Sequence, residues 1–202
     1  EQEEQIQAEE ESKQEEAAFQ QLQSQLKDLT DRTHSTGSEA DESLDSGAIR
    51  RFLRGSHGNL ESAEQRIRKW QQWRNSNSYG LTHPVKDLTR EHPAVQFQLK
   101  IGKCYILAKR DKHNRPIIVV HVRRHDPSAQ SADDLTIFGV HILESGENLL
   151  DKSADLEKQK YCIIFDLEDI AIKNIDYQAA KRIIYMLTFF YPERMGVCLL
   201  LG

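Results

Sequence analysis

Residues 161–201, YCIIFDLEDIAIKNIDYQAAKRIIYMLTFFYPERMGVCLLL, decide the fold class. They contain two continuous apolar runs, residues 161–167 and 197–201, and such runs are typical of strands covered on at least one face. Residues 177–190 between them predict a helix, and Asp176 is a suitable residue to cap its start. A strand, a helix and a strand of these lengths predict a βαβ unit with parallel neighbouring strands.

The link that closes this unit combines a helix stop with two charges. Pro192 is expected to end the helix, and Gly196 is expected to let the chain turn back onto the sheet. Glu193 and Arg194 lie between these two residues. One interpretation of this pair is a local ion pair or cap where the helix meets the strand.

Two further strands and a helix precede the βαβ unit. Cys104–Ala108 and Ile117–Val122 are rich in branched and aromatic residues, which favour strands. Asn114 between them tolerates the left-handed conformation of a tight turn. Residues 131–150 have the apolar spacing of a helix. Residues 93–202 as a whole therefore predict an α/β domain.

The N-terminal part of the chain has a helical character. Residues 1–18 are rich in Glu and Gln, so they predict an acidic tail that is a solvated helix or disordered. Residues 19–75 predict a helical subdomain that contains a polar loop over residues 33–47. Its first apolar stripe has 3-4-3 spacing and consists of Phe19, Leu22, Leu26 and Leu29. The next two helices are expected to begin after caps, Asp45 or Ser46 for the first helix and Asn59 for the second. Residues 75–92 are expected to form a polar connection.

Charge is distributed unevenly along the chain. Residues 1–46 carry 14 acidic and 3 basic side chains, a balance of −11, and the remainder carries 18 acidic and 24 basic side chains, a balance of +6. A mildly basic body favours anionic partners, although a normal mixed surface explains this balance equally well. No apolar run approaches the ~20 residues that a membrane span needs.

The three cysteines, Cys104, Cys162 and Cys198, lie singly within apolar, strand-like runs. This placement predicts buried free thiols in a reducing compartment. Because the chain has no Cys-x-x-Cys pair, no zinc site is expected.

The histidines are the only candidates for catalysis, and their spacing does not favour it. His121 and His125 share one face of an expected strand but lie too far apart to bind one metal ion. His141 and Glu144 lie three residues apart on an expected helix, a spacing equally typical of a surface pair. The sequence contains no nucleophile elbow, phosphate-binding loop or dinucleotide-binding motif. We therefore expect no catalytic residue, metal or cofactor, and the lack of a basic stripe with interleaved aromatics argues against nucleic-acid binding.

Four segments, in this order, resemble the CRAL-TRIO lipid-binding family, which includes retinaldehyde-binding, tocopherol-transfer and phosphatidylinositol/phosphatidylcholine transfer proteins. They are SLDSGAIRRFLRG with NLESAEQRIRKWQQWR, then DKHNRPIIVV, then CIIFDLEDIAIKNIDY, and last FFYPERMG. The resemblance implies an α/β fold in which a helical N-terminal subdomain precedes a small mixed sheet with flanking helices. In the family the sheet continues beyond the position of Gly202, so we expect the domain to be truncated in this chain.

The resemblance also implies a pocket that has the sheet as its floor, helices as its walls and one hydrophobic molecule inside. The expected helix over residues 177–190 has a wider apolar surface than one sheet contact requires, which suits a cavity wall or a larger core. The expected pocket-lining residues are Ile118, Val120, Ile163, Phe165, Ile184 and Leu187.

Two carboxylates match positions at which phosphoinositide-binding members of the family grip the lipid headgroup. Glu193 lies in the Tyr-Pro-Glu-Arg motif, and Asp111 lies in the turn before the Arg-Pro strand. Carboxylates can accept hydrogen bonds from inositol hydroxyls. A further family position, which is basic there, is Ser56 in this chain. The alternative interpretation of Asp111 is a plain turn acid.

We therefore expect a non-enzymatic protein that binds a phospholipid or phosphoinositide and transfers or presents it at membranes. Its partners would be the lipid and, transiently, an anionic membrane surface. Its expected location is cytoplasmic, with peripheral membrane association. The alternative is an interaction module of the adaptor type in GTPase signalling, in which the acidic N-terminal segment would bind a protein partner.

Overall fold

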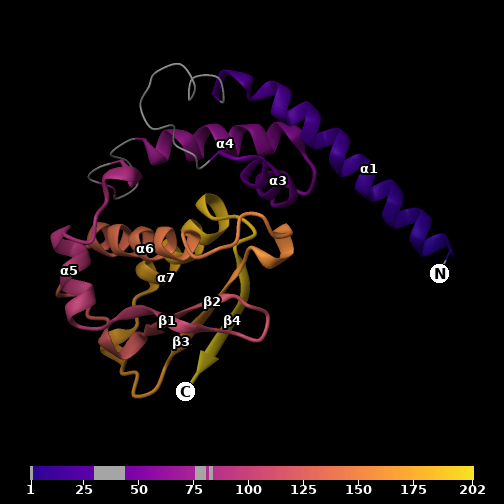
Figure 1. Ribbon diagram of the computed structural model, residues 1–202. Coiled ribbons are helices and arrows are strands. Elements are labelled where there is room, and N and C mark those ends of the chain that lie inside the picture. The colour runs from indigo at the N-terminus through magenta and orange to yellow at the C-terminus, as the bar shows by residue number, and fades with distance from the viewer. Residues whose placement is uncertain (1, 30–43, 76–80, 82–83) are drawn as a thin grey trace. The chain divides into compact units, whose positions relative to one another are not determined.

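The computed structural model describes residues 2–29, 44–75, 81 and 84–202 (Figure 1). The chain divides into two compact units, Glu1–Trp70 and Gln71–Gly202. Most of the predicted polar loop over residues 33–47 lies outside the described residues. Among the described helices, none is long and apolar enough to cross a membrane.

The first unit contains α1 (Gln2–Gln25), α3 (Ser46–Arg54) and most of α4 (Leu60–Arg74). Of the predicted apolar stripe, Phe19, Leu22 and Leu26 are buried, and Leu29 is half-buried. Asp45 caps α3 by accepting a hydrogen bond from the backbone N–H of Ala48 at 2.6 Å. Asn59 caps α4 in the same way, with the N–H of Ser62 at 2.8 Å. Both caps agree with the sequence pattern.

The acidic N-terminal segment takes part in this unit. Glu15 and Glu16 of α1 form ion pairs with Arg54 and Arg50 of α3, each with an N···O distance of 2.7 Å. The Arg50 guanidinium also lies 3.7 Å from the ring centroid of Phe19. The end of α1 thus packs on α3 through both charged and apolar contacts.

The second unit begins with two elements that the sequence did not indicate, η1 (Val85–Asp87), a 3-10 helix, and α5 (Pro93–Lys100). Pro93 occupies the first position of α5, where its missing N–H is not needed. The side chain of His92 accepts a hydrogen bond from the N–H of Ala94 at 3.2 Å. Two turns of helix contain too few apolar residues to show a helical period in the sequence.

Four strands form one mixed sheet in the order β1-β2-β3-β4 (Figure 1). They are β1 (Cys104–Arg110), β2 (Pro116–His121), β3 (Tyr161–Asp166) and β4 (Met195–Leu201). β1 and β2 pair antiparallel, whereas β2, β3 and β4 run parallel. The predicted hairpin and the predicted βαβ unit are both confirmed. Asn114 has the left-handed conformation, with φ of 61°, that the hairpin turn requires.

Helices α6 (Ala132–Glu147) and α7 (Tyr177–Tyr185) lie on one face of this sheet (Figure 1). Ser131 and Asp176 cap their first turns. Three 3-10 helices connect the larger elements: η2 (Val122–Arg124), η3 (Leu156–Lys158) and η4 (Ile172–Asn174). α7 continues into a π-helical turn, η5 (Met186–Phe190). The predicted helix over residues 177–190 therefore has the expected extent but an irregular end.

The prediction that Gly196 makes the turn between the helix and β4 is wrong. Gly196 lies inside β4, where the register with β3 shifts, and does not make the turn. Glu193 makes it instead, with a left-handed φ of 59°. A Cβ at Gly196 would lie 2.8 Å from Arg115 Nη1 and 3.0 Å from Lys160 Cβ. This glycine is therefore needed for close packing rather than for turning.

The predicted fold class, an α/β fold with a helical N-terminal part, a mixed sheet and flanking helices, is confirmed. Cys104 and Cys162 are buried free thiols, as predicted, but Cys198 is exposed. Cys198 lies on β4, which pairs on one side only in the described sheet and so buries its side chains less completely.

Candidate functional site

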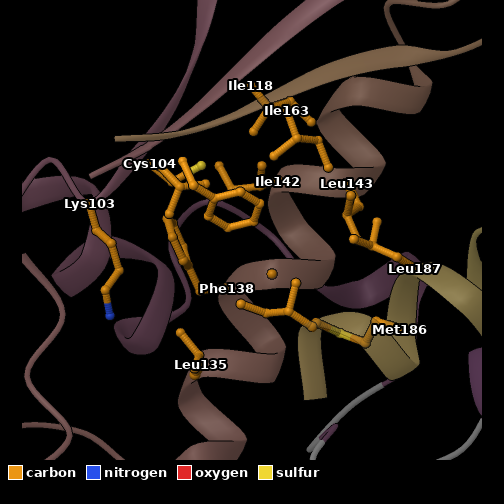
Figure 2. A pocket seen from close by; sticks show the side chains of 14 residues that line it. Lys103, Cys104, Ile118, Leu135, Phe138, Ile142, Leu143, Ile163, Met186 and Leu187 are labelled. Atoms are coloured by element: carbon orange, nitrogen blue, oxygen red, sulfur yellow. The ribbon is translucent and has the colours of Figure 1, made fainter. Parts of the chain in front are cut away.

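An apolar cavity lies between the sheet and the helices α6 and α7 (Figure 2). Its empty volume is about 570 Å³, including the space at its open side. The lining residues are Lys103, Cys104, Ile118, Val120, Leu135, Phe138, Gly139, Ile142, Leu143, Ile163, Phe165, Ile183, Met186 and Leu187. All except Lys103 are apolar or small, so the cavity can surround a hydrocarbon chain.

The strand register explains the floor of the cavity. Ile118 pairs with Ile163, and Val120 pairs with Phe165, across β2 and β3. Because alternate residues of a strand point to the same face, these four side chains project together. Cys104 pairs with Val120 and extends the apolar floor onto β1. Burial raises the pKa of Cys104 to about 12, so its thiol is neutral and acts as a small apolar group.

The helix α6 forms one wall of the cavity, which sequence reasoning missed. Its lining residues repeat at helical spacing and are Leu135, Phe138, Gly139, Ile142 and Leu143. At Gly139 the absent side chain lets η5 approach, since a Cβ there would lie 2.9 Å from Met186 Cε. The apolar positions of α6 are visible in the sequence, but nothing in them distinguishes a cavity wall from a core.

Five of the six residues that the sequence predicts as pocket-lining line this cavity: Ile118, Val120, Ile163, Phe165 and Leu187. Ile184 is a correction, because it is 65% exposed and does not belong to the lining. Ile183 and Met186 take its place beside Leu187. Ile183 is three residues from Met186 and four from Leu187, so it shares their side of the helix, whereas Ile184 is only two residues from Met186 and lies away from the centre of that side.

The carboxylate of Asp111 is occupied within the β1–β2 turn. It accepts hydrogen bonds from the N–H groups of His113 and Arg115 at 2.9 and 2.8 Å, and it pairs with Arg115 Nε at 2.7 Å. Partial burial acts to raise its pKa, but these bonds outweigh burial and hold the pKa below its usual value. This geometry is typical of an acidic residue that stabilises a turn, which was the alternative interpretation of Asp111 from the sequence.

Asp111→Ala is expected to lower the free energy of unfolding by about 1 kcal/mol at pH 7, because the turn loses these bonds. Since the pKa of Asp111 is lowered on folding, its contribution is present above the unfolded value, about 3.9, and disappears as pH falls through the folded value. Urea titrations at several pH values should therefore show the wild type and the variant converging in acid. Lys112→Ala, an exposed neighbour, is the control, and a pH-independent gap would contradict this account.

Glu193 and Arg194 contact different partners. The carboxylate of Glu193 lies 3.9 Å from Lys160 Nζ. Arg194 is buried, pairs with Glu147 of α6 at 2.5 Å and donates a hydrogen bond to the carbonyl of Gln159 at 2.9 Å. Neither Glu193 nor Asp111 lines the cavity. A role for either carboxylate in binding a headgroup stays a prediction.

A chain of three polar side chains, also missed by sequence reasoning, lies beside the cavity. Lys103 Nζ is 2.8 Å from His125 Nδ1, and His125 Nε2 is 3.0 Å from Asp176 Oδ2. An ammonium group can only donate, so Nδ1 of His125 is the acceptor and Nε2–H donates to Asp176. Asn174 holds the His125 backbone by donating to its carbonyl at 2.7 Å. The chain joins the start of β1, the segment after β2 and the start of α7.

The histidines His121 and His125 have different carboxylate partners, Asp166 and Asp176. His121 Nδ1 lies 2.6 Å from Asp166 Oδ2, and no group of three or more His, Cys, Asp or Glu residues in the described part of the chain could hold a metal ion. His125 follows a 3-10 helix, so it does not continue the strand of His121 as expected. Glu144 pairs with Arg74 at 2.7 Å and accepts a hydrogen bond from Tyr191 at 2.6 Å.

Comparisons with known proteins agree with the fold. The sequence model of the CRAL/TRIO domain matches residues 99–202, slightly more than half of the chain. The chain belongs to the CRAL-TRIO family. The predicted resemblance is thereby confirmed.

Two curated relatives and one solved structure extend this comparison. The CRAL-TRIO domain-containing protein C3H8.02 of Schizosaccharomyces pombe is 31% identical over 158 residues, which are 76% of this chain and 34% of that protein. The phosphatidylinositol transfer protein CSR1 of Eremothecium gossypii is 29% identical over 99 residues, which are 49% of this chain and 22% of that protein. This CRAL-TRIO chain thus spans about a third or less of these relatives' lengths. The solved structure of Sfh5 has a TM-score of 0.71 with 12% identity, covering 93% of this chain and 70% of that chain, and it supports the fold alone.

Proposed function

We propose that this CRAL-TRIO protein binds one amphiphilic lipid, with its hydrocarbon chain in the cavity between the sheet and α6 and α7, and transfers or presents it at membranes. The observation that carries the proposal is the lining, in which Lys103 is the one polar side chain among fourteen residues. Members of the family bind and transfer lipids. Because one relative is named a phosphatidylinositol transfer protein, phosphatidylinositol is the first ligand to test.

Burial of a hydrocarbon chain in an apolar cavity can supply a useful affinity. Burial contributes about 0.8 kcal/mol per methylene group, so ten buried groups would contribute on the order of 8 kcal/mol before the cost of ordering the lipid. Without that cost the total would correspond to a Kd of about 1 μM, so the actual Kd is expected to be higher. A transient contact with an anionic membrane surface in the cytoplasm would allow exchange, and the basic balance of the chain beyond residue 46 favours such a surface.

The test is native mass spectrometry of the purified protein after incubation with vesicles of mixed phospholipids that include phosphatidylinositol. We expect one lipid molecule per chain, and denaturation of the complex would release it for identification. If the folded protein carries no lipid at any vesicle concentration, the proposal is wrong.

A matched pair of substitutions on α7 tests whether the lipid lies in this cavity. Ile183→Asn places an amide against the hydrocarbon chain and is expected to weaken lipid binding at least tenfold, about the loss expected for an unpaired buried amide. Ile184→Asn changes an exposed neighbour on the same helix and should leave binding within about twofold. Equal losses in the two variants, measured by the lipid-bound fraction in the same assay, would place the lipid elsewhere.

A further inference from the structure

The side chain of Lys103 is unusual in its surroundings. It is 3% exposed, and its stem lines the apolar cavity. Figure 2 shows it at the margin of the grouped apolar side chains, where its nitrogen is the one nitrogen among the residues drawn. Burial of an ammonium group is unfavourable unless it is paired, so a buried lysine next to an apolar cavity requires compensating partners.

The ammonium group is only partly satisfied by the described residues. It has three N–H donors, and one hydrogen bond is present, to His125 Nδ1 at 2.8 Å. Asp176 balances the charge at a distance, through His125, rather than by direct contact. Two donor positions of Lys103 are therefore left for an acceptor that these residues do not supply.

The electrostatics agree with this geometry. Burial lowers the pKa of Lys103 to about 8, although Asp176 and Asp126 favour the charged form. Burial and the nearby Lys103 ammonium also lower the pKa of His125, although Asp176 acts in the opposite direction, so the imidazole is neutral and free to accept. The attraction of Asp176 and Asp126 thus offsets only part of the unfavourable burial of the Lys103 ammonium group. An added anion at Nζ would supply the missing stabilisation.

We propose that Lys103 binds the anionic end group of an amphiphilic ligand, a carboxylate or a phosphate monoester, whose hydrocarbon chain fills the cavity. His125 and Asp176 are positioning residues, since they hold the ammonium group in place without contacting the ligand. This inference rests on the proposed function, because the hydrocarbon chain must occupy the cavity for its end group to reach Lys103. The inference adds to the proposed function the chemical class of the ligand, an amphiphile with an anionic end group.

The experiment compares three ligands of equal chain length, dodecanoate, dodecyl phosphate and dodecanol, by isothermal titration calorimetry with the full chain at pH 7. We expect the wild type to bind at least one of the two anions about tenfold more tightly than the alcohol. The anion with the higher affinity distinguishes a carboxylate from a phosphate site. Equal affinity for all three ligands would overturn the proposal for Lys103 but leave the cavity as an apolar site. Failure of all three to bind would overturn the proposed function as well.

Lys103→Met keeps the apolar stem and removes the charge, so it should abolish the preference for the anions over dodecanol. Lys109→Met removes an exposed charge from the same strand and should keep the preference. A preference retained in Lys103→Met would overturn the proposal.

The wild type provides a second test that does not depend on a variant folding. The preference for anions should decline as pH rises through about 8, the pKa of Lys103. At that pH, anion binding should also draw a proton onto Lys103, which is measured from the dependence of the heat on the ionisation enthalpy of the buffer. A preference that is constant through this range, without proton uptake, would overturn the proposal.

Discussion

Replacing Arg194 with methionine is expected to lower the free energy of unfolding by about 3 kcal/mol. The Arg194 side chain is 4% exposed and pairs with Glu147, the last residue of α6, at 2.5 Å. Methionine preserves much of the apolar stem but leaves the carboxylate at a helix C-terminus without this cation, where a negative charge is unfavourable. The value is at the low end for a broken buried pair, because the Glu147 side chain is 19% exposed and can still reach water.

Arg194 also connects segments that are distant in the sequence. It donates hydrogen bonds to the carbonyl and the side chain of Gln159 at 2.9 and 3.2 Å. Gln159 in turn donates to the carbonyl of Ala154 at 2.6 Å. The carbonyl of Arg194 accepts from the N–H of Tyr161 at 2.8 Å, at the start of β3. Loss of the guanidinium therefore loosens the end of α6, the loop before β3 and the start of β4 together.

Urea unfolding followed by circular dichroism measures this loss. The matched control is Arg123→Met, whose ion pair with Asp169 joins side chains that are 32% and 80% exposed and is worth less than about 1 kcal/mol. Arg194→Met combined with Glu147→Leu should recover most of the stability, because two apolar groups can replace a buried ion pair. If the double variant is as unstable as the single one, loss of the Arg194 cation beside the Glu147 carboxylate is not the cause.

Patterns that lie within one segment made much of this fold predictable. The apolar runs of β2 and β3, the caps Asp45, Asn59 and Asp176, and the left-handed turn at Asn114 each depend on a few consecutive residues. The same holds for the strand residues of the cavity floor, because alternation along a strand fixes which side chains share a face. Such features need no knowledge of what packs against them.

The features that sequence reasoning missed depend on contacts between distant segments. His125 lies 22 residues from Lys103 and 51 from Asp176, and no local spacing connects these three side chains. Whether Ile183 or Ile184 faces the cavity depends on how α7 and η5 pack against α6, where Gly139 faces Met186 of η5. The π-helical turn Met186–Phe190 likewise has no sequence signature of its own. These features position the walls and the polar margin of the cavity, so the finer chemistry of the site could not be predicted from the sequence.

Gly139→Leu is expected to weaken lipid binding by at least about a hundredfold while the protein stays folded. A Cβ at this position already lies 2.9 Å from Met186 Cε, so a leucine must displace Met186 and occupy the cavity. Overpacking costs about 1–3 kcal/mol, and the better helix propensity of leucine over glycine offsets up to about 1 kcal/mol of this in α6. The substitution thus removes the space for a ligand at a modest cost in stability.

Two glycine-to-alanine variants of α6 separate the blocked cavity from a general effect of replacing a glycine. Gly139→Ala adds one methyl group against the flexible end of Met186 and should weaken binding by less than about tenfold. Gly146 does not line the cavity, and a Cβ there would meet Ile118 and Tyr161 at 3.6 Å, an ordinary contact, so Gly146→Ala should leave binding unchanged. Lipid-bound fractions from native mass spectrometry and melting temperatures of all three variants give the comparison. Wild-type binding by a folded Gly139→Leu variant would mean that the lipid does not occupy this cavity, since no hydrocarbon chain fits beside a leucine there.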